Sequence, residues 1–187
     1  LKADNTVNGT INTINLPISS GVWKFDYRYE TTGVGGNNCA DIDQQCWDIR
    51  FVKNPGGFYS IRLIQRSGSQ DLQLVKKVGN TETVLSTGNV LISVNATFED
   101  FEVQRSSDGK MSVYVDGVFE SSGTDTAVSS STAFEMVGHG IVSGGAVNNF
   151  YDNFFFYQYN AYGTWTSPIF NTAFSTPVLG AFRSTFT

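Results

Sequence analysis

Two neighbouring segments of this chain alternate apolar and polar side chains with a period of two residues, and a tight turn joins them. In residues 101–105, Phe101 and Val103 fall on one face and Glu102 and Gln104 on the other. Residues 111–115 alternate in the same way, and between the two segments lies an Asp-Gly pair at 108–109. Asp-Gly supplies the positive backbone φ that a tight hairpin needs. The pattern predicts a β-hairpin with one buried face.

Similar short strands are predicted along most of the chain. The candidates are residues 22–29, 47–52, 59–65, 72–78, 83–86, 90–94, 133–137 and 149–158. Clusters of Gly, Asn, Ser and Asp separate them, and no window of helical length shows a 3.6-residue apolar repeat. Ten or more such strands indicate an all-β fold, a two-sheet antiparallel jelly-roll sandwich.

The composition supports this fold class and excludes several partners. Only 16% of the 187 residues are charged and 14% are aromatic, which argues against a helical bundle and against disorder. The net charge of -5 argues against binding to nucleic acid. No apolar run approaches the roughly 18 residues of a membrane-spanning helix. We expect a sandwich over residues 1–158 and a separate segment over 159–187.

The two cysteines indicate a cellular compartment. Cys39 and Cys46 are too far apart for a redox motif, and His139 is the one histidine, so no zinc site can be completed. A local disulfide between them is expected, which implies an oxidising, extracellular setting at the cell surface or beyond. Two separate buried thiols are the alternative. The start at Leu1 is expected of either a trimmed secreted chain or an excised domain.

A long stretch without charged side chains lies near each end of the chain. Residues 5–23 and 153–182 hold no charged side chain. Uncharged, β-prone ends tend to pair with other strands unless they are covered. We expect the tail to dock on its own sandwich, on a neighbouring chain or on a following domain, through Trp165, Ile169, Phe170 and Phe174.

Three segments carry a family resemblance. Residues 98–117, with a strand ending in Arg105, the Asp-Gly turn and a Val-Tyr-Val-Asp-Gly strand, resemble the central hairpin of laminin-G-like, concanavalin A-like jelly rolls. Residues 151–156 resemble their closing strand and residues 21–26 an opening strand. This fold hosts lectins, glycan hydrolases, adhesion modules and structural subunits, so the resemblance implies a fold more than a function.

The resemblance also implies a structural calcium ion. Jelly rolls of this sort often hold Ca²⁺ through an Asp of the closing strand, and Asp152 matches that residue. Asp26, near the opening strand, is a second candidate ligand. A hydrogen-bonded Asp-Asn pair is the alternative at this place.

Catalysis is not expected. Glycan hydrolases of this fold carry Glu-x-Asp-x-x-Glu on one strand, and the nearest cluster here, Glu99 to Glu102, has other spacing and diverging side chains. His139 has no evident partner, and no Gly-x-Ser-x-Gly motif is present.

Glycan binding would use aromatic faces and planar polar groups. The candidates on two adjacent strands are Trp47, Arg50, Tyr59, Arg62 and Gln65. Alternation places Asp48, Arg50 and Val52 on one face, with Arg50 and Arg62 toward solvent. Tyr59 should point inward, and Trp47 is either a core anchor or a loop platform. Ordinary packing and surface roles for all five remain the alternative.

Two functions from different classes follow from these observations. The first is a non-catalytic extracellular module that binds a glycan or polysaccharide and is stabilised by calcium. The second is a structural subunit that binds copies of itself, with an uncharged terminal strand completing a neighbour's sheet. Head-to-tail contacts of that kind generate filaments.

Overall fold

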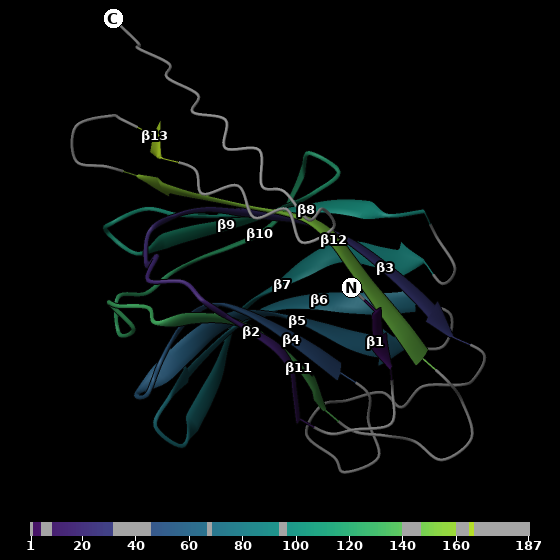
Figure 1. The fold of residues 1–187 in the computed structure, drawn as a ribbon, viewed down its shortest axis with the longest axis horizontal. Helices are drawn as coiled ribbons and strands as arrows, with labels where there is room; N and C mark the ends of the chain where they lie inside the picture. Colours follow the sequence, from purple (N-terminus) through teal and green to yellow (C-terminus); the bar gives the residue numbers. More distant parts are fainter. Residues whose placement is uncertain are drawn as a thin grey trace, which may run out of the picture.

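The computed structural model describes residues 2–4, 9–31, 46–66, 69–93, 97–139, 147–159 and 165–166, and within these ranges every element is a β-strand. The strands form two antiparallel sheets packed face to face (Figure 1). Sheet A has the order β1 (Lys2–Asp4), β12 (Val147–Tyr159), β3 (Gly21–Thr31), β8 (Glu99–Arg105), β9 (Lys110–Val115), β10 (Val118–Thr124). Sheet B has the order β2 (Gly9–Asn15), β11 (Ala133–His139), β4 (Cys46–Asn54), β5 (Gly57–Arg66), β6 (Ser69–Val78), β7 (Thr81–Ser93). The predicted two-sheet sandwich is confirmed. No helix in these ranges is long and apolar enough to cross a membrane.

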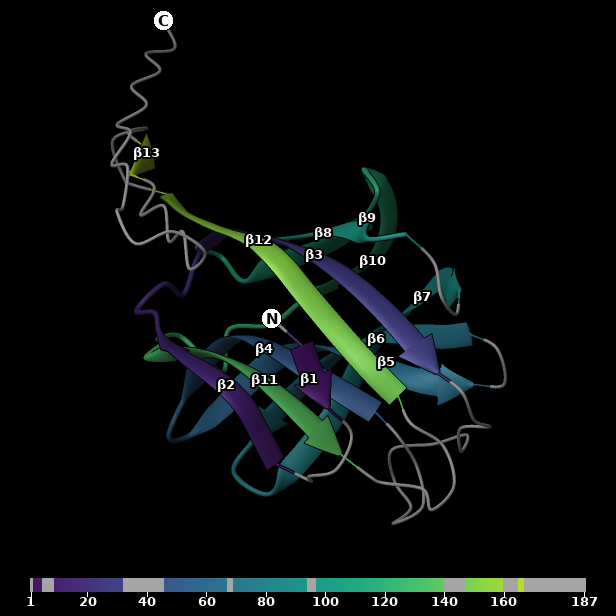
Figure 2. The ribbon, with the colours of Figure 1, turned by 45° about the vertical axis from the view of Figure 1, so that its right-hand side comes forward.

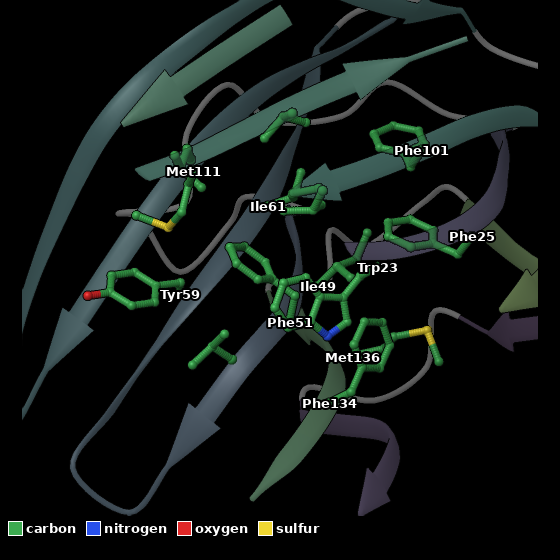
Figure 3. Close-up of a cluster of buried hydrophobic side chains, with 14 of the residues drawn as sticks. Trp23, Phe25, Ile49, Phe51, Tyr59, Ile61, Phe101, Met111, Phe134 and Met136 are labelled. Atoms are coloured by element: carbon green, nitrogen blue, oxygen red, sulfur yellow. The ribbon is translucent and has the colours of Figure 1, made fainter. Parts of the chain in front are cut away.

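Aromatic side chains from both sheets fill the space between them (Figure 3). From sheet A, Phe25 stacks on Phe101 with ring centroids 5.3 Å apart, and both rings are fully buried. From sheet B, Phe134 meets Phe25 edge to face at 6.3 Å. Such pairs add about 0.5–1.5 kcal/mol to the burial of their area. The apolar side chains of residues 101–105 and 111–115, which alternation predicted to share one face, therefore face the core.

Two tight turns join β8, β9 and β10. In the first, Gly109 has φ 86° and its N–H donates to Ser106 O at 3.0 Å. In the second, Asp116 and Gly117 both have positive φ, 51° and 75°. Positive φ at two successive residues matches the right-handed twist of the strands that a hairpin joins. The predicted role of the Asp-Gly turn at 108–109 is confirmed, and β10 follows as a strand that alternation did not indicate.

The described parts of both chain ends pair with β12 of the same sheet. Lys2 of β1 lies opposite Phe150, and Trp165 of β13 (Trp165–Thr166) lies opposite Tyr159. Figure 2 shows β1 beside β12, with β3 on the other side of β12. The backbone of Trp165 thus pairs with a strand of its own sheet, whereas Ile169, Phe170 and Phe174 lie outside the described residues. The division at residue 158 and the assembly role stay predictions.

Sheet B departs from the expected strands at β2, which no candidate segment covered, and at β7. The segments 83–86 and 90–94 were predicted as two strands, but residues 83–86 and 90–93 belong to the single strand β7, and residue 94 lies outside the described residues. Gly88 lies between them, where a Cβ would come 3.0 Å from the Leu72 side chain. The glycine that reads as a break in the sequence is therefore a place of close packing inside a strand.

Candidate functional site

The predicted ligand-binding residues on β4 and β5 fall on both faces of sheet B. Trp47 and Tyr59 face the core with exposed fractions of 4% and 0%. Burial raises the pKa of the Tyr59 phenol, and its hydrogen bond to Asp125, 2.5 Å long, raises it further. Trp47 is therefore a core anchor. Neither ring is open to a ligand, which corrects the expectation of ligand contact through these two rings. The Gln65 side chain lies outside the described residues.

A β-bulge decides which side chains of β4 reach the outer face of sheet B. Arg50 pairs with Ser60 and Val52 with Tyr59, so Phe51 is an extra residue on its strand. Phe51 and Val52 both enter the core, with no exposed surface. The prediction that Val52 shares a face with Arg50 is wrong, because a bulge resets the alternation.

The same bulge brings a second cation to the outer face. Arg50 and Lys53 lie on either side of Phe51 and Val52, and both bind one carboxylate on β11. Arg50 Nη1 donates to Glu135 Oε2 at 3.1 Å, and Lys53 Nζ bonds Glu135 Oε1. In a regular strand, residues 50 and 53 would point to opposite faces, so the bulge is the reason that Lys53 lies on the same face as Arg50.

These groups belong to an ion-pair chain of alternating sign on the outer face of sheet B. Arg62 Nε and Nη2 bond the two oxygens of Asp48 at 2.7 and 3.1 Å. Arg62 also holds Glu82 through two bonds, one of them 3.0 Å long. We name the whole set the ion-pair chain: Lys53, Glu135, Arg50, Asp48, Arg62 and Glu82.

The ion-pair chain is fixed and largely screened from water. Burial would lower the pKa of Arg62, but the hydrogen bonds that Arg62 donates to Glu82 and Asp48 outweigh it and raise that pKa. The Arg62 side chain is 8% exposed and that of Asp48 is fully buried. Arg50 lies over the Phe58 ring at 4.1 Å. Arg50 and Arg62 are on the predicted side of the sheet, but Arg62 donates to Asp48 and Glu82, and Arg50 Nη1 donates to Glu135.

The outer face of sheet A is more open and carries exposed aromatic rings. Phe119 on β10 is 54% exposed, and its ring meets Tyr114 of β9 at a centroid distance of 5.8 Å. Tyr114 lies opposite Glu102, Glu102 opposite Lys24, and Lys24 opposite Phe155. One row thus crosses five adjacent strands. We name it the platform: Phe155, Lys24, Glu102, Tyr114 and Phe119.

Polar groups hold the centre of the platform in place. Lys24 Nζ pairs with Glu102, and Gln104 Nε2 donates to the same carboxylate at 2.5 Å. The bond to Glu102 raises the pKa of Lys24. Burial would raise the pKa of Glu102, but the bonds from Lys24 and Gln104 lower it overall. Both groups are therefore charged at neutral pH, and aromatic rings lie on either side of them.

Alternation alone puts Tyr114 and Glu102 on the outer faces of their strands. Their meeting with Lys24 and Phe155 depends on β3 and β12, which are far away in the sequence. This explains why the platform was absent from the predicted site.

The predicted calcium ligands lie side by side on the same sheet. Asp152 is opposite Asp26, and Asn153 bonds both: its N–H donates to Asp152 Oδ1 at 2.9 Å and its Nδ2 to Asp26 Oδ2 at 2.6 Å. A hydrogen-bonded Asp-Asn arrangement, the alternative, is thus present. Ca²⁺ takes six to eight oxygens, and the described ranges hold no group of three His, Cys, Asp or Glu that could bind a metal ion. Calcium stays a prediction.

The remaining candidates are only partly described. Cys46 is disulfide-bonded, whereas Cys39 lies outside the described residues. His139 ends β11 opposite Cys46. Glu99 lies opposite Tyr27, which faces the core, and Glu102 lies opposite Lys24 on the outer face. The two carboxylates diverge as predicted, an arrangement that does not suit a pair flanking one glycosidic bond.

Comparisons with known proteins agree on the fold. The chain is similar to the carbohydrate binding module CBM66 from Bacillus subtilis, at 13% identity and a TM-score of 0.58 over 82% of this chain and 89% of that one. It is also similar to a tetrameric galectin from the ball sponge Cinachyrella sp., at 14% identity and a TM-score of 0.55 over 76% and 96%. The Emp47p carbohydrate recognition domain gives 8% identity and a TM-score of 0.52 over 82% of each chain. No family model and no curated protein matches the sequence.

These likenesses show a shared two-sheet jelly-roll sandwich. They do not distinguish a laminin-G-like domain from other members of this fold, so that finer assignment stays a prediction. At such low identity they transfer no binding residue to this chain.

Proposed function

We propose that this chain is a non-catalytic glycan-binding module and that the platform on sheet A is its binding surface. The observation that carries the proposal is the cross-strand row itself. It combines an aromatic pair, the exposed Phe119 and the half-buried Tyr114, with a fixed pair of opposite charges, Lys24 and Glu102.

Both halves of the row suit a sugar. The C–H faces of sugar rings pack against aromatic rings, and Phe119 offers more than half of its surface. Sugar hydroxyls both donate and accept, so they can bond Lys24 and Glu102 together. Charged partners make the stronger hydrogen bonds. Because Gln104 already orients Glu102, little side-chain freedom would be lost on binding.

Other observations support the same proposal. Structures of the same fold bear the names carbohydrate binding module, galectin and carbohydrate recognition domain. Glu99 and Glu102 point to opposite faces, which favours binding over hydrolysis. An extracellular location is part of the proposal.

Affinity electrophoresis through gels that contain one polysaccharide each tests it. We expect at least one of dextran, hydroxyethyl cellulose, inulin, galactan and a β-1,3-glucan to retard the protein. Tyr114→Ala and Phe119→Ala should each weaken that binding about tenfold or more, the effect of removing a central aromatic contact. Val84→Ala is the matched control, because Val84 is 46% exposed on the other sheet.

The control should migrate like the parent chain. Unchanged far-UV circular dichroism would show that the aromatic variants keep the fold. Retardation by none of these polysaccharides or their acidic derivatives, or equal retardation of both aromatic variants and the parent, would contradict the proposal.

A further inference from the structure

A row of four aspartates runs beside the platform on sheet A. Asp152 of β12 lies opposite Asp26 of β3, and Asp26 lies opposite Asp100 of β8. Asp116, which follows β9, completes the row: its N–H donates to Asp100 O, and its carboxylate accepts from Asp100 N, both at 2.8 Å. Like charges at directly opposite positions destabilise a sheet. We name these residues the aspartate row.

Within the described residues, none of the four aspartates forms an ion pair that would offset the charge of the aspartate row. Burial raises the pKa of Asp100, and the neighbouring carboxylates of Asp26, Glu102 and Asp116 raise it further, although Lys24 acts in the opposite direction. The Lys24–Glu102 pair at the centre of the platform is neutral as a unit. The local potential over this face is therefore negative.

The aspartate row is close enough to the platform to act on a ligand bound there. Asp26, Asp100 and Asp116 each stand two residues from a platform member on the same chain segment. Two residues of a strand span about 7 Å. The Debye length is about 8 Å at physiological ionic strength, so an anionic group on the platform would be repelled with little screening.

The platform is also longer than one sugar. Its aromatic residues stand at both ends, with Phe155 on β12 and Tyr114 on β9 three strands apart in the sheet. Neighbouring strands lie about 4.8 Å apart, so these ends are separated by about 14 Å. A ligand that touches both must be a chain of several sugar units.

We propose that the ligand of the platform is an extended, uncharged glycan lying across the strands from β12 to β10, and that the aspartate row excludes acidic glycans. This inference rests on the proposed function. It assigns the aspartates a part in specificity, in which a repulsive element rejects the wrong ligand.

The test compares neutral polysaccharides with acidic derivatives of the same backbone. The pairs are dextran with carboxymethyl dextran, hydroxyethyl cellulose with carboxymethyl cellulose, inulin with carboxymethyl inulin, galactan with carboxymethyl galactan, and a β-1,3-glucan with its carboxymethyl form. We expect the parent chain to bind a neutral member at least tenfold more tightly than its acidic partner in 20 mM buffer. Discrimination should shrink in 1 M NaCl, where the Debye length is about 3 Å.

The isosteric double variant Asp26→Asn/Asp100→Asn should bind the acidic partner several-fold more tightly than the parent does, with unchanged affinity for the neutral one. Asp108→Asn/Glu120→Gln is the matched control, because it removes two carboxylates outside the aspartate row. It should bind like the parent. Equal binding of neutral and acidic members by the parent, or equal gains in the two double variants, would overturn the inference and leave the proposed function standing.

Phe155→Ala tests the length of the ligand. We expect it to weaken binding of the neutral polysaccharide, as Phe119→Ala does. Loss with Phe119→Ala alone would confine the ligand to the β9–β10 end and overturn the extended binding mode. Retardation by no polysaccharide, neutral or acidic, would overturn the proposed function itself and this inference with it.

Discussion

Tyr59 donates a hydrogen bond from its phenol to Asp125 Oδ1 over 2.5 Å, although its ring is fully buried. The Tyr59 phenol oxygen accepts from Val128 N at 3.0 Å, and Arg105 lies over the Tyr59 ring at 5.1 Å. Arg105 in turn donates to the backbone oxygens of Asp125 and Val128. One tyrosine thus fastens the loop after β10 to the core.

Replacing Tyr59 by Phe should destabilise the fold by about 1–3 kcal/mol, because Val128 N and Asp125 each lose a buried partner. Tyr114→Phe is the control, since that hydroxyl lies on the outer face of sheet A and water can replace its contacts. Urea denaturation measures both. Equal midpoints for the two variants would show that the Asp125 contact contributes nothing.

Arg62 is the centre of the ion-pair chain, and its removal should lower the free energy of unfolding. Arg62→Leu leaves Asp48, whose side chain is fully buried, without its two-bond partner. Breaking a buried pair costs about 3–5 kcal/mol, whereas replacing both members by apolar residues is often close to neutral. Urea denaturation should therefore show Asp48→Leu/Arg62→Leu to be more stable than Arg62→Leu alone.

Glu82→Gln is the companion measurement for that series. The Glu82 side chain is 40% exposed, so its pairing with Arg62 should contribute no more than about 1 kcal/mol. If the double apolar variant were the least stable of the three, the ion-pair chain would be a net source of stability.

The strands of this fold could be predicted where alternation is regular and the turn is short. The hairpin of β8 and β9 satisfies both conditions, and so its core face was correctly assigned. Alternation failed at Val52, because the bulge at Phe51 depends on pairing with β5 and β11. A single strand does not reveal which partner will demand an extra residue.

The candidate site was harder to predict for the same reason. Arg50 and Arg62 were assigned to the correct face, but their burial depends on Asp48, Glu82 and Glu135, which come from three different strands. The platform joins β12 and β3, whose paired residues Phe155 and Lys24 are more than a hundred positions apart. Such long-range register is set by the packed core and leaves no local trace in the sequence.

Gly109 and Gly117 lie in hairpin turns and both have positive φ. Substituting each by Ala separates the effect of backbone strain from that of steric crowding around a new Cβ. A Cβ on Gly109 would come 2.4 Å from Asp125 O, whereas one on Gly117 would meet no atom within 4 Å. Both substitutions to Ala carry the cost of a left-handed backbone, about 1 kcal/mol. Gly109→Ala should lower the thermal midpoint well beyond Gly117→Ala, because the backbone of Asp125 must also move. Equal shifts would mean that the loop yields freely.

Glu99 should make the stability of the fold depend on pH. Burial raises the pKa of its carboxyl to about 7, and the nearby Asp116 adds to the rise. Because the unfolded group titrates near 4.5, the folded chain holds a proton between these pH values that the unfolded chain has released. The stability that the folded chain gains from the protonated Glu99 carboxyl is therefore fully present below pH 4.5 and is lost as the pH rises through 7.

Glu99→Gln should remove this contribution to the pH dependence. We expect the variant to be more stable than the parent at pH 8, on the order of 1–2 kcal/mol after allowance for solvent screening, and close to it at pH 4. Urea denaturation at pH 4, 6 and 8 measures the difference, with Glu120→Gln as a control that should follow the parent. A constant offset between Glu99→Gln and the parent across this range would mean that the Glu99 carboxyl titrates in the folded chain as it does in the unfolded one.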